Sequence, residues 1–185
     1  FRSITIGSGV ESMSRAPWSM LKPNRVPTTI PPKMWDTTVG WRFNNPRMDQ
    51  LYPIISLGEA AEVIAEELQI SRKDQDQYAL KSHERAITAI NNGVFKDEIV
   101  PITVNSKRGK SKIVEVDEHP RYEFTENHYN LAISIDDLSK LKPAFKADGT
   151  VTAGNSSGIN DGAAAILLAS RDKARELGLR PLVKW

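Results

Sequence analysis

A continuous apolar run at residues 163–169 (AAAILLA) restricts the possible folds of this chain more than any other segment. Such a run is typical of a strand that is covered on both faces, because a strand with one solvated face alternates apolar and polar side chains. Ser170 can cap a short helix that stops at Gly178, and residues 182–183 begin a further strand. This strand–helix–strand order predicts a layered α/β core.

The N-terminal part of the chain combines one strand with an irregular stretch and a helix. Residues 3–9 (SITIGSG) form a β-branched run that stops at glycines, whereas residues 10–55 hold most of the prolines and show no sustained periodicity. Apolar positions recur at helical spacing through residues 57–68, with glutamates on the remaining faces. Ser56 and Glu59 have the spacing of a capping box, so we expect an amphipathic helix to begin there.

A second helix and a hairpin are expected next. Ser71 and Asp74 repeat the capping arrangement, and the helix that they open reaches the Asn-Gly pair at residues 92–93. Two consecutive helices suggest an antiparallel pair. Residues 99–104 and 113–116 are β-rich runs separated by a polar, glycine-containing stretch, which predicts a β-hairpin.

Composition excludes several classes of function. With 39% apolar and 26% charged residues and a net charge of +2, the chain fits one soluble domain without a field that would recruit nucleic acid. No apolar run approaches the roughly 20 residues that span a bilayer. The chain has no cysteine, and therefore no disulfide, thiolate metal site or cysteine nucleophile. We expect a cytoplasmic protein without a metal, a nucleic-acid partner or a membrane partner. The opening without Met and the ending on a new strand predict a fragment.

A tight, glycine-rich segment, GNSSGINDG at residues 154–162, follows an expected strand at residues 150–153, and residues 117–135 before them are polar and weakly patterned. Absent side chains let a ligand approach the backbone, yet Asn, Asp, Ser and Gly also dominate turns. The segment lacks the Lys-Ser/Thr ending of a P-loop and the GxGxxG spacing of a dinucleotide site. Spacing alone therefore favours a capped turn over a ligand-binding loop.

Residues 149–165 (GTVTAGNSSGINDGAAA) closely resemble the TVTAGNxSGxNDGAAA block of the thiolase family. Further segments resemble that family in the same order: GVESMSRAPW (9–18), LGEAAEVIAEELQISRKDQDQYALKSHERA (57–86), FKDEIVP (95–101), DEHPR (117–121) and LKPAF (141–145). The resemblance covers nearly the whole chain, and its motifs are specific to the family.

This resemblance implies an α/β chain that is part of the layered α-β-α-β-α thiolase fold, incomplete here, with an inserted helix-plus-hairpin loop domain. Residues 1–14 would end a strand of the N-terminal core half, and residues 15–156 would form the loop domain that covers coenzyme A. Residues 157–185 would return to the core. By the same resemblance, the whole protein would be a homodimer or a homotetramer.

The implied activity is that of an acetyl-CoA C-acyltransferase, which condenses two acetyl-CoA molecules or cleaves a 3-ketoacyl-CoA with coenzyme A. Thiolases use a cysteine nucleophile, an activating histidine and a second cysteine. The resemblance places the nucleophile upstream of Phe1 and the other groups beyond Trp185, so no catalytic residue is expected in these 185 residues. Coenzyme A would be a substrate, and no cofactor is expected. One alternative is an inactive, thiolase-like acyl-CoA-binding protein. Another is a decarboxylating or hydroxymethylglutaryl-type relative, although by resemblance the intact glycine-rich block argues against it.

Several substrate contacts carry over from the resemblance. Ser157 matches a serine that hydrogen-bonds the pantetheine arm, and Ala153 matches a backbone contact to the same arm. Arg121 matches a basic residue beside the nucleotide, which suits a guanidinium, although it also fits a solvated loop cation. Phe145 and Met48 match apolar residues near the adenine or the pantetheine.

Ser56 and Leu57 occupy the positions where short-chain biosynthetic members tend to have His-Met, so the acyl-chain preference stays open. Ser56 is foremost a helix cap, and a helix N-terminus beside the acyl tunnel also offers free N–H groups. His83 matches no catalytic position and fits the edge of the core. The cations in residues 107–112 could meet the ribose phosphate, but a solvated hairpin tip is the better interpretation.

Overall fold

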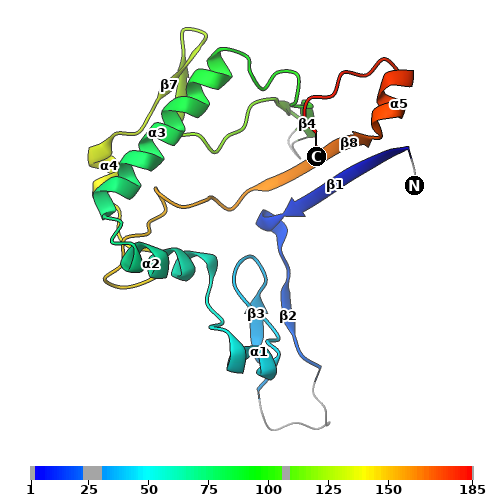
Figure 1. Cartoon of the computed structure of the whole chain (residues 1–185). Coiled ribbons are helices and arrows are strands. Elements are labelled where there is room, and N and C mark those ends of the chain that lie inside the picture. The colour runs from blue at the N-terminus through cyan, green and yellow to red at the C-terminus, as the bar shows by residue number, and fades with distance from the viewer. Residues whose placement is uncertain (1–2, 23–30, 106–108, 185) are drawn as a thin grey trace. The chain divides into compact units, whose positions relative to one another are not determined.

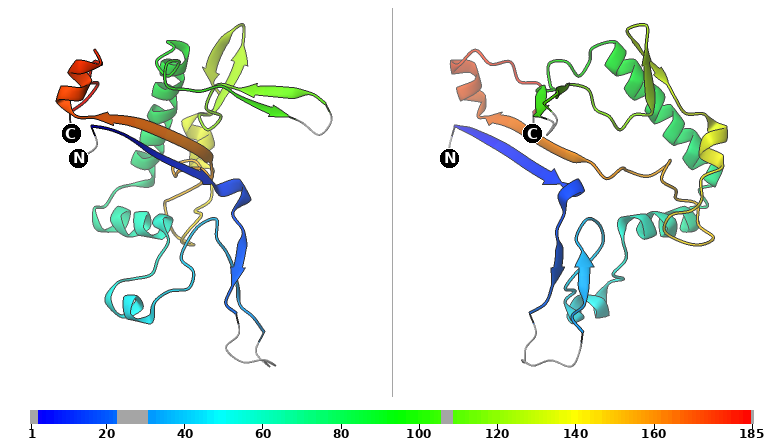
Figure 2. Two further views of the ribbon diagram at one scale, coloured as in Figure 1. Left: turned by 90° about the vertical axis from the view of Figure 1, so that its right-hand side faces the viewer. Right: turned by 180° about the vertical axis from the view of Figure 1, so that it is seen from behind.

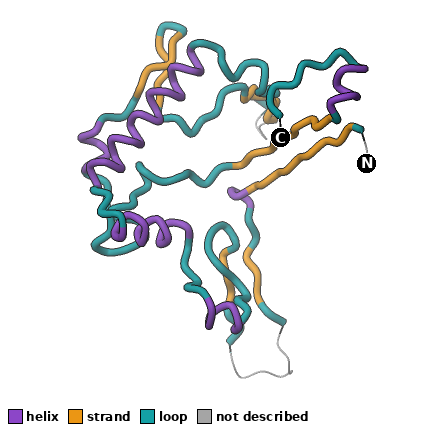
Figure 3. Tube along the Cα trace, viewed as in Figure 1, coloured by secondary structure: helices purple, strands orange, loops and turns teal. Residues whose placement is uncertain are grey.

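A computed structural model describes residues 3–22, 31–105 and 109–184, and it divides into two compact units. Unit 1 consists of residues 1–38 and 159–185, and unit 2 of residues 39–158. Figure 1 shows the helices and strands of both units, and Figure 3 shows which segments are helix, strand or loop.

Unit 1 is built on two antiparallel strands, β1 (Ile4–Ser12) and β8 (Asp161–Ala169). They pair over their whole length and run side by side in every view (Figures 1 and 2). The apolar run is therefore a strand, as predicted. Its faces are not covered, however, since Ile166, Leu167 and Leu168 are each more than half exposed. In the described part of the chain β8 has one neighbouring strand, β1, so the expected double cover is not present there.

The C-terminal helix α5 (Arg171–Glu176) begins and ends where the sequence predicts. The Ser170 side chain accepts a hydrogen bond from the Lys173 amide, and Gly178 has the left-handed φ of +66° that ends many helices. The strand expected at residues 182–183 is wrong, because these residues pair with no strand in the described structure.

The proline-rich stretch contains more regular structure than expected. Strands β2 (Trp18–Met20) and β3 (Met34–Asp36) pair in antiparallel fashion, a short 3₁₀ helix spans Met13–Arg15, and helix α1 covers Pro46–Leu51. Each element is too short to produce a sustained sequence period. Residues 23–30, between β2 and β3, lie outside the described residues.

Unit 2 contains both predicted helices, α2 (Leu57–Glu67) and α3 (Arg72–Asn91). They do not form the expected antiparallel pair, because α3 packs against β7 (His128–Leu131) and α4 (Ile135–Ser139) instead (Figure 1). The apolar stripe of α2 is not its buried face. The stripe residues Leu57, Ile64 and Leu68 are more than half exposed, whereas Glu62 is buried.

Two hairpins complete unit 2. The predicted one pairs β4 (Ile102–Asn105) with β5 (Ser111–Val114), and the other pairs β6 (Tyr122–Thr125) with β7 in the segment judged weakly patterned. Glu126 and Asn127, which join β6 to β7, both have positive φ, as a type I′ hairpin turn requires. Asn91 fixes this hairpin to α3 through reciprocal hydrogen bonds with the Tyr129 backbone, at 2.8 and 3.0 Å.

Candidate functional site

The segment at residues 149–157 contains two of the predicted site residues, Ala153 and Ser157, and a buried carboxylate from α2 holds its start. The Glu62 carboxylate accepts hydrogen bonds from the Thr150 amide at 2.8 and 3.0 Å and from the Val151 amide at 2.8 Å. The Thr150 hydroxyl adds a further bond at 3.1 Å. Glu62 is only 6% exposed, and Gly149 is packed so closely on it that an added Cβ would collide with the carboxylate.

A second buried carboxylate, from α3, holds the same segment farther along. Asp76 is 2% exposed and accepts a hydrogen bond at 2.9 Å from the Asn155 side-chain amide. It also pairs with Arg72, one turn before it in α3, at 2.7 Å. The Arg72 guanidinium donates as well to the carbonyls of Leu138 and Leu141, so α3, α4 and the segment are joined by one polar network.

The backbone of the segment is folded on itself rather than paired as a strand. The Thr152 amide donates to the Asn155 side chain at 2.7 Å, the Thr152 carbonyl accepts from the Ser156 hydroxyl at 2.7 Å, and the Val151 carbonyl accepts from the Ala144 amide at 2.9 Å. The strand expected at residues 150–153 is therefore wrong, apart from one bridge between Thr152 and Pro143. Side chains occupy most of the backbone hydrogen-bonding groups of residues 150–152 that a neighbouring strand would need, and the Ala144 amide occupies the Val151 carbonyl.

Two of the residues predicted to contact the substrate keep polar groups without a protein hydrogen bond in this part of the described structure. In the described structure the backbone N–H and C=O of Ala153 and the hydroxyl of Ser157 have no protein hydrogen-bond partner, and both residues are exposed. Between them, Gly154 is buried, and a Cβ there would come within 2.5 Å of methyl carbons of Leu138 and Leu141. The segment thus presents unpaired polar groups from a backbone that is fixed on its other side.

The predicted residues around the start of α2 also come together. The capping box forms in full, with the Ser56 amide donating to the Glu59 carboxylate at 2.7 Å and the Glu59 amide donating to the Ser56 hydroxyl at 3.3 Å. The Phe145 ring lies against Gly58, so closely that a Cβ on Gly58 would collide with it. Leu57, between Ser56 and Gly58, is 92% exposed. Phe145, Ser56 and Leu57 therefore form one local surface.

Arg121 is not part of α3 but is bonded to it, farther along the helix than Asp76. Its amide donates to the Nδ1 of His83 at 3.3 Å, which requires the neutral ring with its proton on Nε2. Burial, together with the charges of His119 and Arg121, lowers the pKa of His83 from 6.5. His83 follows Asp76 by two helical turns on the same face of α3, so Arg121 is attached about 10 Å along the helix from the bond to Asn155.

Met48 lies on α1 and is 38% exposed, outside the network around residues 149–157. Of the basic hairpin, Lys112 is paired with Glu118 at 2.7 Å, while Lys107 and Arg108 lie outside the described residues. This ion pair favours the interpretation of Lys112 as part of a solvated hairpin.

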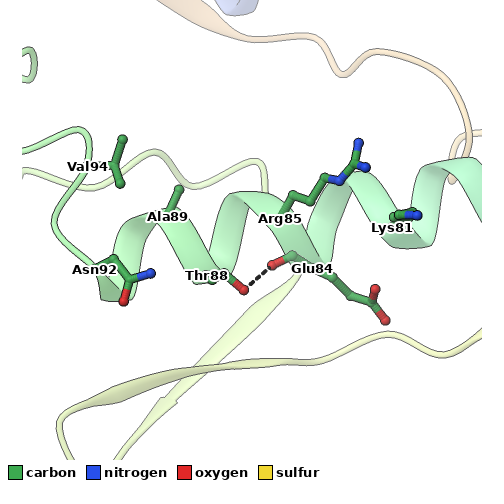
Figure 4. A pocket seen from close by; sticks show the side chains of 7 residues that line it. All are labelled: Lys81, Glu84, Arg85, Thr88, Ala89, Asn92 and Val94. Carbon is green, nitrogen blue, oxygen red and sulfur yellow. Dashed lines mark hydrogen bonds between the residues drawn. The ribbon is translucent and has the colours of Figure 1, made fainter.

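A shallow groove of about 440 Å³ runs along α3 (Figure 4). It is lined by Lys81, Glu84, Arg85, Thr88, Ala89, Asn92 and Val94. At 100° per residue, Lys81 and Arg85 lie 140° to 180° around the helix from Asp76. The groove therefore faces away from the segment at residues 149–157 and does not extend the candidate site.

Sequence reasoning missed the two carboxylates that organise the site. The helical pattern predicts Glu62 on a solvated face of α2, and nothing in the sequence around Asp76 predicts that it is buried. A weak signal was available, because Glu62 precedes Ala65 by three residues and so shares a helical face with a position expected to be buried. Among the described residues, no group of three acidic or histidine side chains could hold a metal ion, and no helix is long and apolar enough to cross a membrane.

Comparison with known proteins identifies the class to which this fold and segment belong. Residues 2–172 match the sequence model of the family described as "Thiolase, N-terminal domain". The chain is therefore a member of the thiolase family.

Individual relatives agree with this assignment. The chain is 44% identical over 178 residues to a beta-ketoadipyl-CoA thiolase of Escherichia coli and 46% identical over 178 residues to one of Pseudomonas putida. Each match covers 96% of this chain and 42% of the relative, so the chain spans less than half the length of these curated proteins.

Solved structures show the same partial coverage. The acetyl-CoA acetyltransferase of Bacillus anthracis is similar with a TM-score of 0.76 at 38% identity, and human mitochondrial 3-ketoacyl-CoA thiolase with a TM-score of 0.71 at 33% identity. Each match covers 97% of this chain and 42% of the solved chain. The fold is thus an incomplete thiolase fold, as the sequence resemblance implied.

Proposed function

We propose that this chain belongs to a thiolase-type acyltransferase and that its segment at residues 149–157 binds the coenzyme A part of the substrate. The reaction would be the condensation of two acetyl-CoA molecules or the thiolytic cleavage of a 3-ketoacyl-CoA. The observation that carries the proposal is the pair of unengaged groups at Ala153 and Ser157. Their neighbours in the same segment are hydrogen-bonded within the protein, so these groups are available to the amides of a pantetheine arm without breaking a protein contact.

The position of Arg121 supports the same proposal. A coenzyme A molecule has its charged nucleotide at one end and its amide-rich arm at the other, so its two ends need separate contacts. Arg121 is attached to α3 about 10 Å from the point where Asn155 is held, and its side chain is exposed. Phe145 supplies an apolar surface at the start of α2. We propose Arg121 for the nucleotide end, with Phe145, Met48, Ser56 and Leu57 as further contacts to the substrate.

The catalytic cysteines and histidine belong, in this proposal, to sequence outside the 185 residues. We also propose that the whole protein is a cytoplasmic homodimer or homotetramer. The complete reading frame should place a cysteine about twenty residues before β1, which the resemblance to thiolases implies. Absence of that cysteine would favour the alternative function, an inactive acyl-CoA-binding protein.

Thiolysis of acetoacetyl-CoA by the protein from the complete reading frame tests the proposal. The enolate absorbance of the substrate should fall when coenzyme A is added, whereas the purified 185-residue chain should leave it unchanged. In the active protein, Ser157→Ala should raise the KM for coenzyme A about three- to tenfold, the effect of one lost hydrogen bond. Ser82→Ala is the matched control, because Ser82 lies on α3 near the outward groove and should leave the KM unchanged.

Other outcomes of these two measurements would favour the alternative function or contradict the proposal. Coenzyme A binding without turnover would support the binding-protein alternative. A protein that neither binds coenzyme A nor turns over the thioester would contradict the proposal, as would equal KM values for Ser157→Ala and the unaltered protein.

A further inference from the structure

Glu62 is a buried carboxylate whose charge is stabilised mainly by hydrogen bonds from residues 150 and 151, with a smaller electrostatic contribution from Lys146. Among the described residues it forms no ion pair, and the nearby Lys146 pairs with the exposed Glu66 at 2.8 Å. The donors that it does have are the amides of Thr150 and Val151 and the Thr150 hydroxyl. A buried carboxylate without donors would be strongly unfavourable, so these contacts are needed for Glu62 to remain ionised in place.

The same contacts fix the orientation of two successive peptide groups. Because the N–H groups of Thr150 and Val151 point at Glu62, the carbonyls of the same peptide planes are turned away from it. One of these carbonyls, that of Thr150, accepts a hydrogen bond from the Asn155 side chain at 3.1 Å, and the following carbonyl, that of Val151, accepts one from the Ala144 amide at 2.9 Å. The direction in which the chain enters Ala153 is therefore set two residues earlier, at Val151, by its hydrogen bond to Glu62.

We infer that Glu62 is a positioning residue for substrate binding, which aims the free backbone groups of Ala153 and the hydroxyl of Ser157 at the pantetheine arm. This inference rests on the proposed coenzyme A site. Glu62 itself does not touch the substrate; it acts through Thr150 and Val151. A site whose donors are already oriented loses less entropy on binding, so a misplaced segment should weaken the complex before it affects the chemistry.

Replacement of Glu62 by glutamine isolates this role. Glu62→Gln keeps the length and shape of the side chain but turns one of the two accepting oxygens into an NH₂ donor. That donor would face an amide N–H of Thr150 or Val151, since both oxygens now accept a backbone bond. Glu66→Gln is the matched control, because Glu66 lies one turn later on α2 and is exposed, and its carboxylate accepts a hydrogen bond from Lys146 and none from the segment at residues 149–157 in the described structure.

Two measurements on the protein from the complete reading frame test the inference. Steady-state thiolysis should show the KM for coenzyme A raised about tenfold in Glu62→Gln with kcat within about threefold, since equal loss from the bound ground state and transition state raises KM alone. Amide hydrogen exchange should be faster at Thr150 and Val151 in that variant and unchanged in Glu66→Gln. A purely stabilising role would instead lower the unfolding midpoint with an unchanged KM in the folded fraction.

The outcomes separate this inference from the proposed function. An unaltered protein that does not bind coenzyme A would refute the proposed function, and unaltered exchange at Thr150 and Val151 in Glu62→Gln would refute the positioning role whether or not coenzyme A binds. If Glu62→Gln does not fold, Glu62→Asp keeps the charge on a side chain one CH₂ shorter. A folded Glu62→Asp protein with an unchanged KM would also overturn the inference.

Discussion

The structure leaves no room for a side chain at Gly154, and the loss of stability on adding one can be estimated from the distances around it. In Gly154→Ala the new Cβ would lie 2.5 Å from the Cδ2 of Leu138 and 2.5 Å from the Cδ1 of Leu141. Carbon atoms pack best at about 3.5 to 4.0 Å, so both leucines would have to retreat by about 1 Å. Leu138 is fully buried and has no solvent into which it can move. We expect a loss of about 1 to 3 kcal/mol in the free energy of unfolding, the usual range for overpacking.

Gly162 provides a matched control within the same glycine-rich block. A Cβ there would meet no atom within 4 Å, and neither glycine has a φ in the left-handed region. Gly162→Ala should therefore be neutral or stabilise by up to about 1 kcal/mol, because it restricts the unfolded chain. Urea unfolding followed by far-ultraviolet circular dichroism measures both variants. Equal changes in the two, or a loss below about 0.5 kcal/mol in Gly154→Ala, would refute the close packing of Gly154.

Two further predictions concern charged and titrating groups on α3. Asp76→Asn should lower the free energy of unfolding by about 1 to 3 kcal/mol, because it weakens the bonds from Arg72 and Asn155 to a buried oxygen pair; urea unfolding with an unchanged midpoint would contradict this. The pKa of His83 is lowered by burial and by His119 and Arg121, so the folded state favours the neutral ring. Below the ordinary value of 6.5 the unfolded chain binds the proton more readily, and stability should fall as the pH falls from 6.5 toward the folded pKa. Urea unfolding at a series of pH values should show this slope in the unaltered protein and not in His83→Gln; the same slope in both would assign the effect to another group.

The elements that could be predicted from the sequence are those fixed by short-range chemistry. Helices α2 and α3 begin at Ser56 and Ser71 because each serine side chain accepts a backbone hydrogen bond three residues later. Strand β8 follows from its continuous apolar run. The turn of the β6–β7 hairpin was not recognised, because Glu126 adopts a positive φ that side-chain identity rarely indicates outside glycine, asparagine and aspartate.

The features that could not be predicted depend on contacts between distant residues. Helical periodicity gave α2 an apolar stripe but not the direction in which that stripe faces, and the buried face holds Glu62 instead. The donors that make this burial possible are 88 and 89 residues away, at Thr150 and Val151. A local pattern contains no information about such a partner. The same bonds remove residues 150–153 from strand pairing, which is why that strand prediction was wrong.

The glycine-rich block shows that a capped turn and a ligand contact need not be competing interpretations. Asn155 does what turn residues do, by bonding the Thr152 amide and the Thr150 carbonyl, and Asp161 accepts two hydrogen bonds from Ser14 within unit 1. The bonds of Asn155 engage the backbone of Thr150 and Thr152, and they leave the polar groups of Ala153 and the Ser157 hydroxyl free in the described structure. A loop with many unpaired groups would bind water and change conformation, whereas one with its neighbours satisfied can hold Ala153 and Ser157 ready for a single partner. The turn is in this sense the condition for the coenzyme A contact that we propose.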